Sequence, residues 1–422
     1  MANFKDHKVS VNELLGFIPE ALLSHLFTST KVNHYSKVLH GKKMFYLLLY
    51  AILDNERLRQ RILEDTFNHS GFKTIFNLDE SETVRRSSIS ERLSKIDYGY
   101  FKEIFEYMYG RFSESYSQCE RDKYNLIRVD STIVSEAAGK LREGIDMKTG
   151  KKNIKFSVSF DGILPAGVEI FNTQSYSSEE NALPEAILKQ IKRDTEHRNI
   201  YIIDRGLQST RVMKDFLQKN VKFVIRSKEN RKHQEIESLI KEGQDLDIGD
   251  NLLIKDSIVN LYTGTPIHNK RGNIHFREEK LENQFRLVIV KNKEQPQKIF
   301  WFITNDFDLT AKEVVDYYRR RWDIEVFFRF IKQELNVSHL VSLSKNGMEV
   351  MIYMTLIVAM LVLIYKKANN LGYKTAKRRF VMELRELITV IMIILSEEIL
   401  TKSLKRKVVG ISSDHSCSVI SF

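Results

Sequence analysis

The first 120 residues repeat apolar and charged positions with the period of an α-helix. Two long stretches show this period, KKMFYLLLYAILDNERLRQRILEDTF from residue 42 and SSISERLSKIDYGYFKEIFEYMYGRF from residue 87. In the second stretch Ser87 or Ser88 can act as the N-cap, with Glu91 three residues beyond Ser88 as in a capping box. No alternating strand pattern interrupts these stretches. The pattern predicts a helical N-terminal domain over residues 1–120.

Beyond residue 124 the pattern changes to short apolar runs separated by turns and helical stretches. The Asp161-Gly162 pair stands between two of the runs and is a turn signal. The first three strands are expected to pair antiparallel, and helices separate the later ones, which is an α/β layout. The expected strands are 125–134, 154–160, 166–174, 199–204 and 222–227, and the expected helices are 179–196 and 209–219.

Residues 229–308 interrupt the α/β pattern with charged turns and further strands. Four runs have strand composition: LLIKDSIVNLYTG, NIHFREEKL, QFRLVIVKN and KIFWFITND. A helix follows, and Thr310 with Glu313 three residues later has the spacing of a capping box. We predict one continuous helix from there past Lys332. Residues 121–228 and 309–345 would then form one α/β domain that carries a β-rich insertion.

The C-terminal region, residues 346–422, is predicted to be helical. Its segment Val350–Tyr365 has sixteen residues without a charge, which raises the question of a membrane. A bilayer needs about 18 to 20 such residues, so we interpret the segment as a buried core helix rather than a transmembrane one. A second amphipathic stretch, Phe380–Leu395, can pack against it to form a helical hairpin.

Composition and charge narrow the class of protein. With 422 residues, of which 42% are hydrophobic, the chain can bury a large core and is expected to form two or three domains. Its formal charge of +11 favours a polyanionic partner, nucleic acid first, although an ordinary basic protein can have the same balance. Cys119 and Cys417 are the only cysteines, and the N-terminus lacks the apolar core of a signal peptide. A reducing cytoplasm is the expected location.

Four reactive side chains fall on one narrow stripe of the helix predicted after residue 310: Tyr318, Arg321, Glu325 and Lys332. At about 100° per residue they lie within an arc of about 60°. The other faces of this helix are apolar, so Glu325 should be partly buried and needs a partner. That partner is either Arg321, four residues earlier, or a divalent metal ion shared with further carboxylates. On this helix alone, an intrahelical salt bridge explains the stripe equally well.

Two aspartates in the strand runs offer such carboxylates. Asp130 lies in the first strand and Asp204 ends the fourth, and with Glu325 they would form a three-carboxylate cluster. Hard oxygen ligands of this kind suit Mg²⁺ or Mn²⁺, and a pair of such ions can drive an in-line phosphoryl transfer. The tyrosine and the two cations of the stripe could then hold phosphates. Each aspartate taken singly is also explained as a hydrogen-bonded strand residue or as the start of a turn.

Basic residues gather at the second of the N-terminal helical stretches. Arg85 and Arg86 stand just before it, and Arg92 and Lys95 lie on it. This helix could enter a DNA groove or line phosphates. A plain helical bundle with a solvated basic face would carry the same residues.

Together these residues match a known family. The chain resembles bacterial insertion-sequence transposases of the DDE class, in the insertion-sequence-4 family, whose signature is Tyr-x2-Arg-x3-Glu-x6-Lys. The four residues of the stripe match that signature. Asp130, in IRVDST, and Asp204, in IIDRG, resemble the first and second catalytic aspartates of the family, and Glu325 resembles the third carboxylate. The resemblance covers residues 120–345 and includes the β-rich insertion.

The resemblance implies a ribonuclease H-like catalytic core with two Mg²⁺ ions, for which Mn²⁺ can substitute. It also implies cut-and-paste transposition of an insertion sequence, with end cleavage, a hairpin intermediate and strand transfer into target DNA. Two protomers would bring two DNA ends together, and the N-terminal domain would recognise the terminal inverted repeats. The enzyme would act in a bacterial cytoplasm, on the nucleoid when bound to DNA, and without a membrane.

Two positions depart from the pattern of the family. Leu207 stands where relatives commonly have an aromatic residue after Asp-Arg-Gly. Some relatives use a tryptophan of the insertion to stack a flipped base, and the corresponding position here is Phe300, with Trp301 next to it. Because adjacent strand residues point to opposite faces, only one of these two rings can stack on a base. Core packing is the alternative for both.

The alternative function is sequence-specific DNA binding by a domesticated protein that is catalytically silent. The intact set of Asp130, Asp204 and Glu325 argues against it, because decay would not spare all three. A membrane-associated helical protein is a third interpretation, which rests on residues 350–365 alone.

Overall fold

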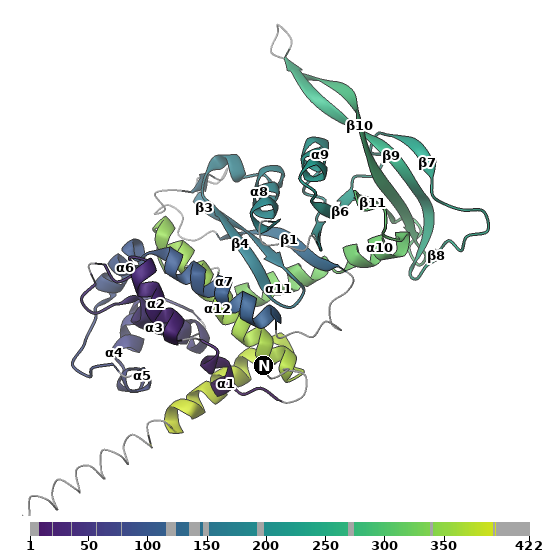
Figure 1. The fold of residues 1–422 in the computed structure, drawn as a ribbon. Coiled ribbons are helices and arrows are strands. Elements are labelled where there is room, and N and C mark those ends of the chain that lie inside the picture. The colour runs from purple at the N-terminus through teal and green to yellow at the C-terminus, as the bar shows by residue number, and fades with distance from the viewer. Residues whose placement is uncertain are drawn as a thin grey trace, which may run out of the picture.

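The computed structural model describes residues 8–393, except 19, 35, 56 and 77 and the segments 115–123, 135–143, 147–151, 192–197, 269–273, 338–340 and 391–392. Cys119, Cys417 and the expected helix end at Leu395 lie outside these residues. The molecule has helices at one end, a mixed sheet in the middle and a long β-hairpin at the other end (Figure 1).

The N-terminal region is helical, as its sequence period predicts, and residues 8–114 contain no strand where the structure describes them. One helix start differs from the prediction. α6 has Arg85 at its N-cap without a side-chain cap bond, and Ser87 and Ser88 lie inside the helix. Glu64 supplies an acceptor instead, because its Oε2 binds the N–H of Arg86 at 3.1 Å. The helices are α1 (Val11–Gly16), α2 (Glu20–Ser29), α3 (Gly41–Asp54), α4 (Gln60–Asn68), α5 (Ser70–Ile75), α6 (Arg86–Lys95) and α7 (Tyr98–Glu114).

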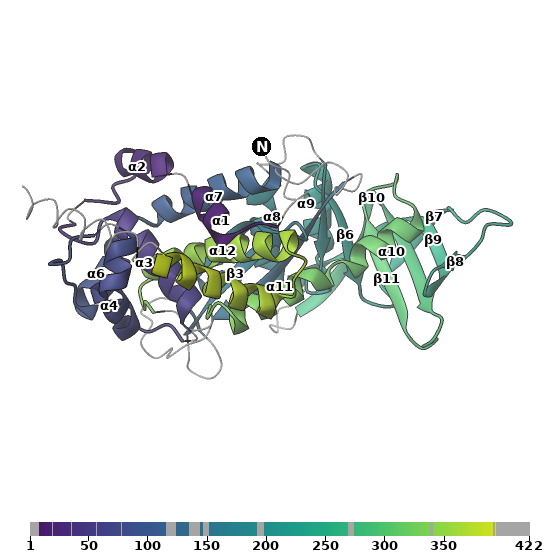
Figure 2. The same ribbon diagram turned by 90° about the horizontal axis from the view of Figure 1, so that it is seen from below.

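The long apolar segment is a core helix. α12 (Lys345–Ala368) has the length and composition of a membrane span, but 94% of its apolar window is buried inside the protein. It packs against α3, α6 and α7 in the helical part of the molecule (Figure 2). Residues 373–390 form a further helix that returns along it, with the rings of Tyr365 and Phe380 in edge contact at 5.5 Å. The two helices are in contact at Tyr365, the predicted hairpin up to Leu395 lies partly outside the described residues, and no membrane protein is implied.

The described strands form one mixed sheet with the path β2-β3-β1-β5-β6-β11-β10-β9-β7, with β4 beside β3 and β8 beside β9. β1, β3 and β4 pair antiparallel, as predicted, whereas β5 and β6 run parallel to β1. The strands are β1 (Asn125–Val134), β2 (Ile145–Asp146), β3 (Lys152–Phe160), β4 (Pro165–Phe171), β5 (Asn199–Ile203), β6 (Lys222–Ser227), β7 (His233–Ser238), β8 (Asp247–Ile248), β9 (Asn251–His268), β10 (Ile274–Asn292) and β11 (Ile299–Thr304).

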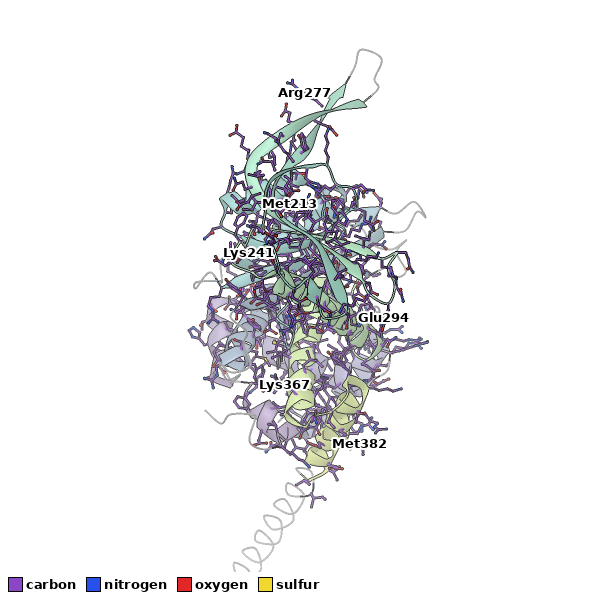
Figure 3. The ribbon with its side chains drawn as sticks, turned by 90° about the vertical axis from the view of Figure 1, so that its right-hand side faces the viewer. Met213, Lys241, Arg277, Glu294, Lys367 and Met382 are labelled. Atoms are coloured by element: carbon purple, nitrogen blue, oxygen red, sulfur yellow. The ribbon has the colours of Figure 1, made fainter. Side chains whose placement is uncertain are left out.

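The strands of the predicted β-rich insertion extend this same sheet. β11 pairs antiparallel with β6, and β10 and β9 follow it. The runs NIHFREEKL and QFRLVIVKN are joined in the single strand β10, with a register shift between Lys280 and Gln284. β9 and β10 form a hairpin that projects from the body. Arg277 lies towards its far end, and Met382 lies at the opposite end of the molecule (Figure 3).

Helices cover both faces of the sheet, and each face has its own apolar core. On one face Ile187 and Phe216 pack with Val129. On the other face Val314 packs with Ile202, and the core extends into the C-terminal helices. The helices of this part are α8 (Glu179–Ile191) and α9 (Thr210–Gln218) on the first face, and α10 (Ala311–Arg319) and α11 (Trp322–Gln333) on the second.

The single helix predicted to begin at Thr310 is in fact two helices. It starts as predicted, with the capping box of Thr310, but α10 ends after nine residues and α11 begins at Trp322. The amides of Arg320 and Arg321 bond to carbonyls three residues back, at 3.2 and 2.9 Å, which is the tighter 3₁₀ pattern. Tyr318 therefore lies on α10, and the rest of the stripe lies at the start of α11 and along it.

Candidate active site

Asp130 and Asp204 lie at one level of the sheet. β1 and β5 are parallel neighbours, and Val129 pairs with Ile203 in their register. Asp130 is the next residue along β1, and Asp204 directly follows β5. The carboxyl end of parallel strands is where open α/β sheets bind ligands. The placement of the two aspartates on neighbouring strands is as the sequence predicts.

Asp130 carries a carboxyl group with a perturbed pKa. Burial raises the pKa of Asp130 to about 6, and the negative charges of Glu179 and Asp204 add to the increase. The N–H of Ser131, which donates to Oδ1 at 2.8 Å, and the guanidinium of Arg321 act in the opposite direction. Neighbouring negative charges that raise the pKa of Asp130 indicate a site with an excess of negative charge. Glu179, the first residue of α8, was not among the residues predicted from the sequence.

Arg321 joins the other two carboxylates. Its Nη2 donates to Glu325 Oε1 at 2.5 Å, and its Nε lies 3.6 Å from Asp204 Oδ1. Tyr318 donates its hydroxyl proton to the same oxygen of Asp204 at 3.1 Å. Burial would lower the pKa of Arg321, but Asp204, Tyr318 and Glu325 raise it overall, so the guanidinium stays charged. The ion pair that the sequence offers as one partner of Glu325 is therefore present.

The three carboxylates are not gathered around a common point. Within the described ranges, no group of three or more His, Cys, Asp or Glu side chains is placed to hold a metal ion. The guanidinium of Arg321 contacts both Asp204 and Glu325. The structure thus places Asp130 and Asp204 on neighbouring strands and Glu325 against Arg321, and the three-carboxylate cluster stays a prediction.

Lys332 lies on the Asp130 side of the site. Burial lowers the pKa of Lys332, and the attraction of Asp130 partly offsets that effect. Its Nζ also lies 6.0 Å from the centre of the Phe328 ring. Lys332 thus interacts with Asp130, whereas the direct contacts of Arg321 are with Asp204 and Glu325.

Arg128, in β1, holds the bend between α10 and α11. Its guanidinium donates to Arg320 O at 3.1 Å and to Asp323 Oδ2 at 2.9 Å, and it also donates to Asp161 O at 3.0 Å. Gly162 has φ +99°, and a Cβ there would lie 2.8 Å from Nη1 of this arginine, so the turn needs a glycine. Sequence reasoning missed Arg128. A charged residue within the apolar run NLIRV was the available signal.

Phe300 and Trp301 point to opposite faces of β11. Phe300 belongs to the apolar cluster that also includes Tyr318, and the guanidinium of Arg226 lies 5.0 Å from its ring centre. Trp301 packs on the other face, edge-on to His233 at 5.7 Å. Phe300 is therefore the ring on the Tyr318 face.

The basic residues predicted to contact DNA differ in exposure. Arg85 and Arg86 are exposed at the start of α6. The guanidinium of Arg92 instead donates to main-chain carbonyls, from Nε to Leu39 O at 2.8 Å and from Nη2 to Val32 O. These bonds tie α6 to the segment before α3, so Arg92 does not present a free cation.

Comparison with known proteins identifies relatives. The family described as transposase DDE domain matches residues 121–361. One relative is a Synechocystis sp. protein, which is named as a transposase for insertion sequence element IS4SA. It is 23% identical over 340 residues, which cover 77% of this chain and 82% of the relative. A Geobacillus stearothermophilus protein, named as a probable transposase for insertion sequence element IS5377, is 23% identical over 269 residues, or 62% of each chain.

Among solved structures, the cryo-EM structure of a piggyBac transposase synaptic complex with hairpin DNA is 13% identical and covers 98% of this chain and 86% of that chain. Its TM-score of 0.44 is too low to support an argument about this protein. The family match, in contrast, spans more than half of the chain and includes Asp130, Asp204 and Glu325. The chain therefore belongs to the family of transposases with a DDE domain.

Proposed function

We propose that this protein is a bacterial transposase of the insertion-sequence-4 family that moves its element by Mg²⁺-dependent cut and paste. Membership of the DDE family makes it a DNA-cleaving and strand-transferring enzyme. The observation that carries the proposal is the pair Asp130 and Asp204 at one level of adjacent parallel strands, with Glu325 linked to Asp204 through Arg321. The insertion-sequence names of two relatives support it.

Asp130, Asp204 and Glu325 are the proposed ligands of two Mg²⁺ ions, for which Mn²⁺ can substitute. Their oxygens are the hard donors that these ions prefer. Burial, and to a smaller degree the charges of Glu179 and Asp204, disfavour the ionised form of Asp130, and a divalent cation would favour that form. Glu325 can bind a metal ion once its carboxylate separates from the guanidinium of Arg321. When bound, such ions activate the attacking oxygen and stabilise the leaving one.

Tyr318, Arg321 and Lys332 are proposed to hold the DNA backbone at the reacting phosphate. Arg321 is charged, and only 17% of its side chain is exposed, so its interaction with a phosphate would be weakly screened. Lys332 supplies a second positive charge beside Asp130. The hydroxyl of Tyr318, which now donates to Asp204, can donate to a phosphate oxygen instead.

The strand order β4-β3-β1-β5-β6, with three antiparallel strands followed by two parallel ones, supports a ribonuclease H-like core. We assign that core to residues 121–228 and 309–345 and the β-rich insertion to 229–308. Residues 1–120 are the proposed DNA-binding domain, and 346–422 are the C-terminal helical region.

The proposed partners are the terminal inverted repeats, the target DNA and a second protomer that brings the other DNA end. Exposed Arg85 and Arg86 are candidates for contact with the repeats. Phe300 is the proposed stacking residue for a flipped base at a hairpin intermediate, because it lies on the Tyr318 face and Trp301 does not. The enzyme would act in the bacterial cytoplasm, on the nucleoid when bound to DNA.

Cleavage of DNA that carries the inverted repeats flanking the gene tests the site. Asp130→Ala, Asp204→Ala and Glu325→Ala should each abolish Mg²⁺-dependent cleavage and leave binding to end DNA largely unchanged. Asp215→Ala, which removes an exposed carboxylate of α9, is the matched control and should cleave normally. Retained cleavage in any of the three variants would contradict the assignment of the metal ligands.

The same assay separates an active enzyme from a silent, domesticated DNA-binding protein. The wild-type protein should both bind and cleave end DNA, and its binding should weaken steeply as salt rises, because phosphate contacts release counterions. Binding without cleavage by the wild-type protein would favour the silent alternative. A flat response to salt would contradict a phosphate-dominated interface.

A further inference from the structure

Asp204 lies just outside the hydrogen-bonded ladder of β5, at the start of a short loop that leads to α9. The side chain is 43% exposed, and the carboxylate contacts Tyr318 and Arg321. Asp130, in contrast, lies within β1 and pairs with Val158 of β3. The position of Asp204 therefore depends on what fixes the loop that follows it.

The side-chain amide of Gln208 holds this loop from inside. Nε2 donates to Arg205 O at 2.8 Å within the loop and to Arg226 O at 3.0 Å at the end of β6. Oε1 accepts from Lys228 N at 3.2 Å and from Arg231 Nη1 at 3.2 Å. One side chain thus links the loop after Asp204 to the neighbouring parallel strand and to the turn beyond it.

The main chain of Gln208 is held as well. Its N–H donates to Glu180 Oε1 at 2.6 Å, and the N–H of Ser209 donates to the other oxygen of the same carboxylate at 3.0 Å. Its carbonyl accepts from Arg231 Nη2 at 2.7 Å. Leu207 adds an apolar anchor, because it is fully buried in the core beneath α8 and α9. The loop is therefore fixed by α8, by the end of β6 and by the core.

We propose that Gln208 is a positioning residue for Asp204, acting through the bonds of its side-chain amide to Arg205 O in the loop, to Arg226 O in β6 and to Arg231. The inference rests on the proposed function, since it gives Asp204 the role of a metal ligand. Groups that orient a metal ligand commonly change metal affinity or activity by about 10- to 100-fold when they are removed.

Gln208→Ala tests the proposal, with Gln295→Ala, an exposed glutamine of the turn between β10 and β11, as the matched control. We expect Gln208→Ala to lower the cleavage rate and weaken Mn²⁺ binding, measured by calorimetry without DNA, by about 10-fold or more. Affinity for end DNA should be unchanged. Gln208→Glu retains Oε1 as an acceptor and loses the Nε2 donor, so its effects should be intermediate.

The double variant Asp204→Ala/Gln208→Ala distinguishes positioning from general stability. If Gln208 acts through Asp204, the double variant should bind Mn²⁺ no more weakly than Asp204→Ala alone. Additive losses, normal Mn²⁺ binding by Gln208→Ala, or equal losses of DNA binding and metal binding would overturn the inference. Failure of the wild-type protein to bind Mn²⁺ or cleave would instead count against the proposed function.

Discussion

Asp130→Asn should abolish cleavage and yet stabilise the metal-free protein. Asp130 has a pKa of about 6 in the folded protein, against an ordinary value of 3.8. Because one pKa unit corresponds to about 1.4 kcal/mol, keeping this carboxylate ionised lowers the free energy of unfolding by about 3 kcal/mol at pH 7.5. Asparagine removes the charge and keeps Oδ1 as the acceptor for the N–H of Ser131.

The sign of the pH dependence follows from proton linkage. An acid whose pKa is raised by folding binds its proton more tightly in the folded state, so stability falls as pH rises from about 4 to about 6. Above about pH 6 the loss of free energy of unfolding no longer changes with pH. The stabilisation by Asp130→Asn should therefore be about 1.5 kcal/mol at pH 5 and about 3 kcal/mol at pH 7.5.

Thermal unfolding in EDTA at the two pH values measures this difference. Asp130→Asn should melt a few degrees above the wild-type protein at pH 7.5, with a smaller gap at pH 5, and Asp215→Asn should match the wild type. Added Mg²⁺ should then stabilise the wild-type protein and have little effect on Asp130→Asn, because a ligand of the ion is lost. A variant that melts below the wild type at pH 7.5 without metal, or a gap that does not grow with pH, would refute the reasoning.

Three further outcomes are expected. Arg321→Ala should slow cleavage, because the proposed phosphate contact is lost. It should also tighten Mn²⁺ binding in calorimetry, because the guanidinium competes with the ion for two carboxylates. Weaker Mn²⁺ binding would contradict this competition. Asp256→Ala should lower the free energy of unfolding by about 3–5 kcal/mol in denaturant melts, because it leaves Arg286 buried without its bidentate partner; a loss under 1 kcal/mol would count against it. Phe300→Leu should reduce DNA end processing in a gel assay more than Trp301→Leu does, and equal effects would argue against base stacking by Phe300.

Sequence patterns predicted the elements that place the two aspartates. The limits of β1 agree with the predicted run 125–134, and β5 ends one residue before the predicted limit at Asp204. Both are local signals, since an apolar run that ends in a charge or a turn can be recognised without knowledge of its neighbours. The antiparallel start of the sheet was equally predictable, because the Asp161-Gly162 turn marks its second hairpin.

Features that depend on partners far along the chain could not be predicted in this way. Arg128 fixes the bend before α11 through a carbonyl 192 residues away, so no local pattern could reveal that the helix breaks there. Arg92 matched the pattern of a solvated basic face, and only the carbonyls of Leu39 and Val32 show that it points inward. Gln208 is a similar case, because its partners lie on β6, α8 and the turn after β6.

The bend between α10 and α11 changes what the stripe means. The contact between Arg321 and Glu325 is an ion pair across the first turn of α11. Tyr318 on α10 and Arg321 at the start of α11 both contact Asp204, which directly follows β5 more than a hundred residues earlier. Partly buried charges of this kind lose solvation that an ion pair only partly restores, so they contribute little to stability by themselves. Under the proposed function the salt bridge and the active site are the same set of contacts, and catalysis would explain why a stability cost is retained there.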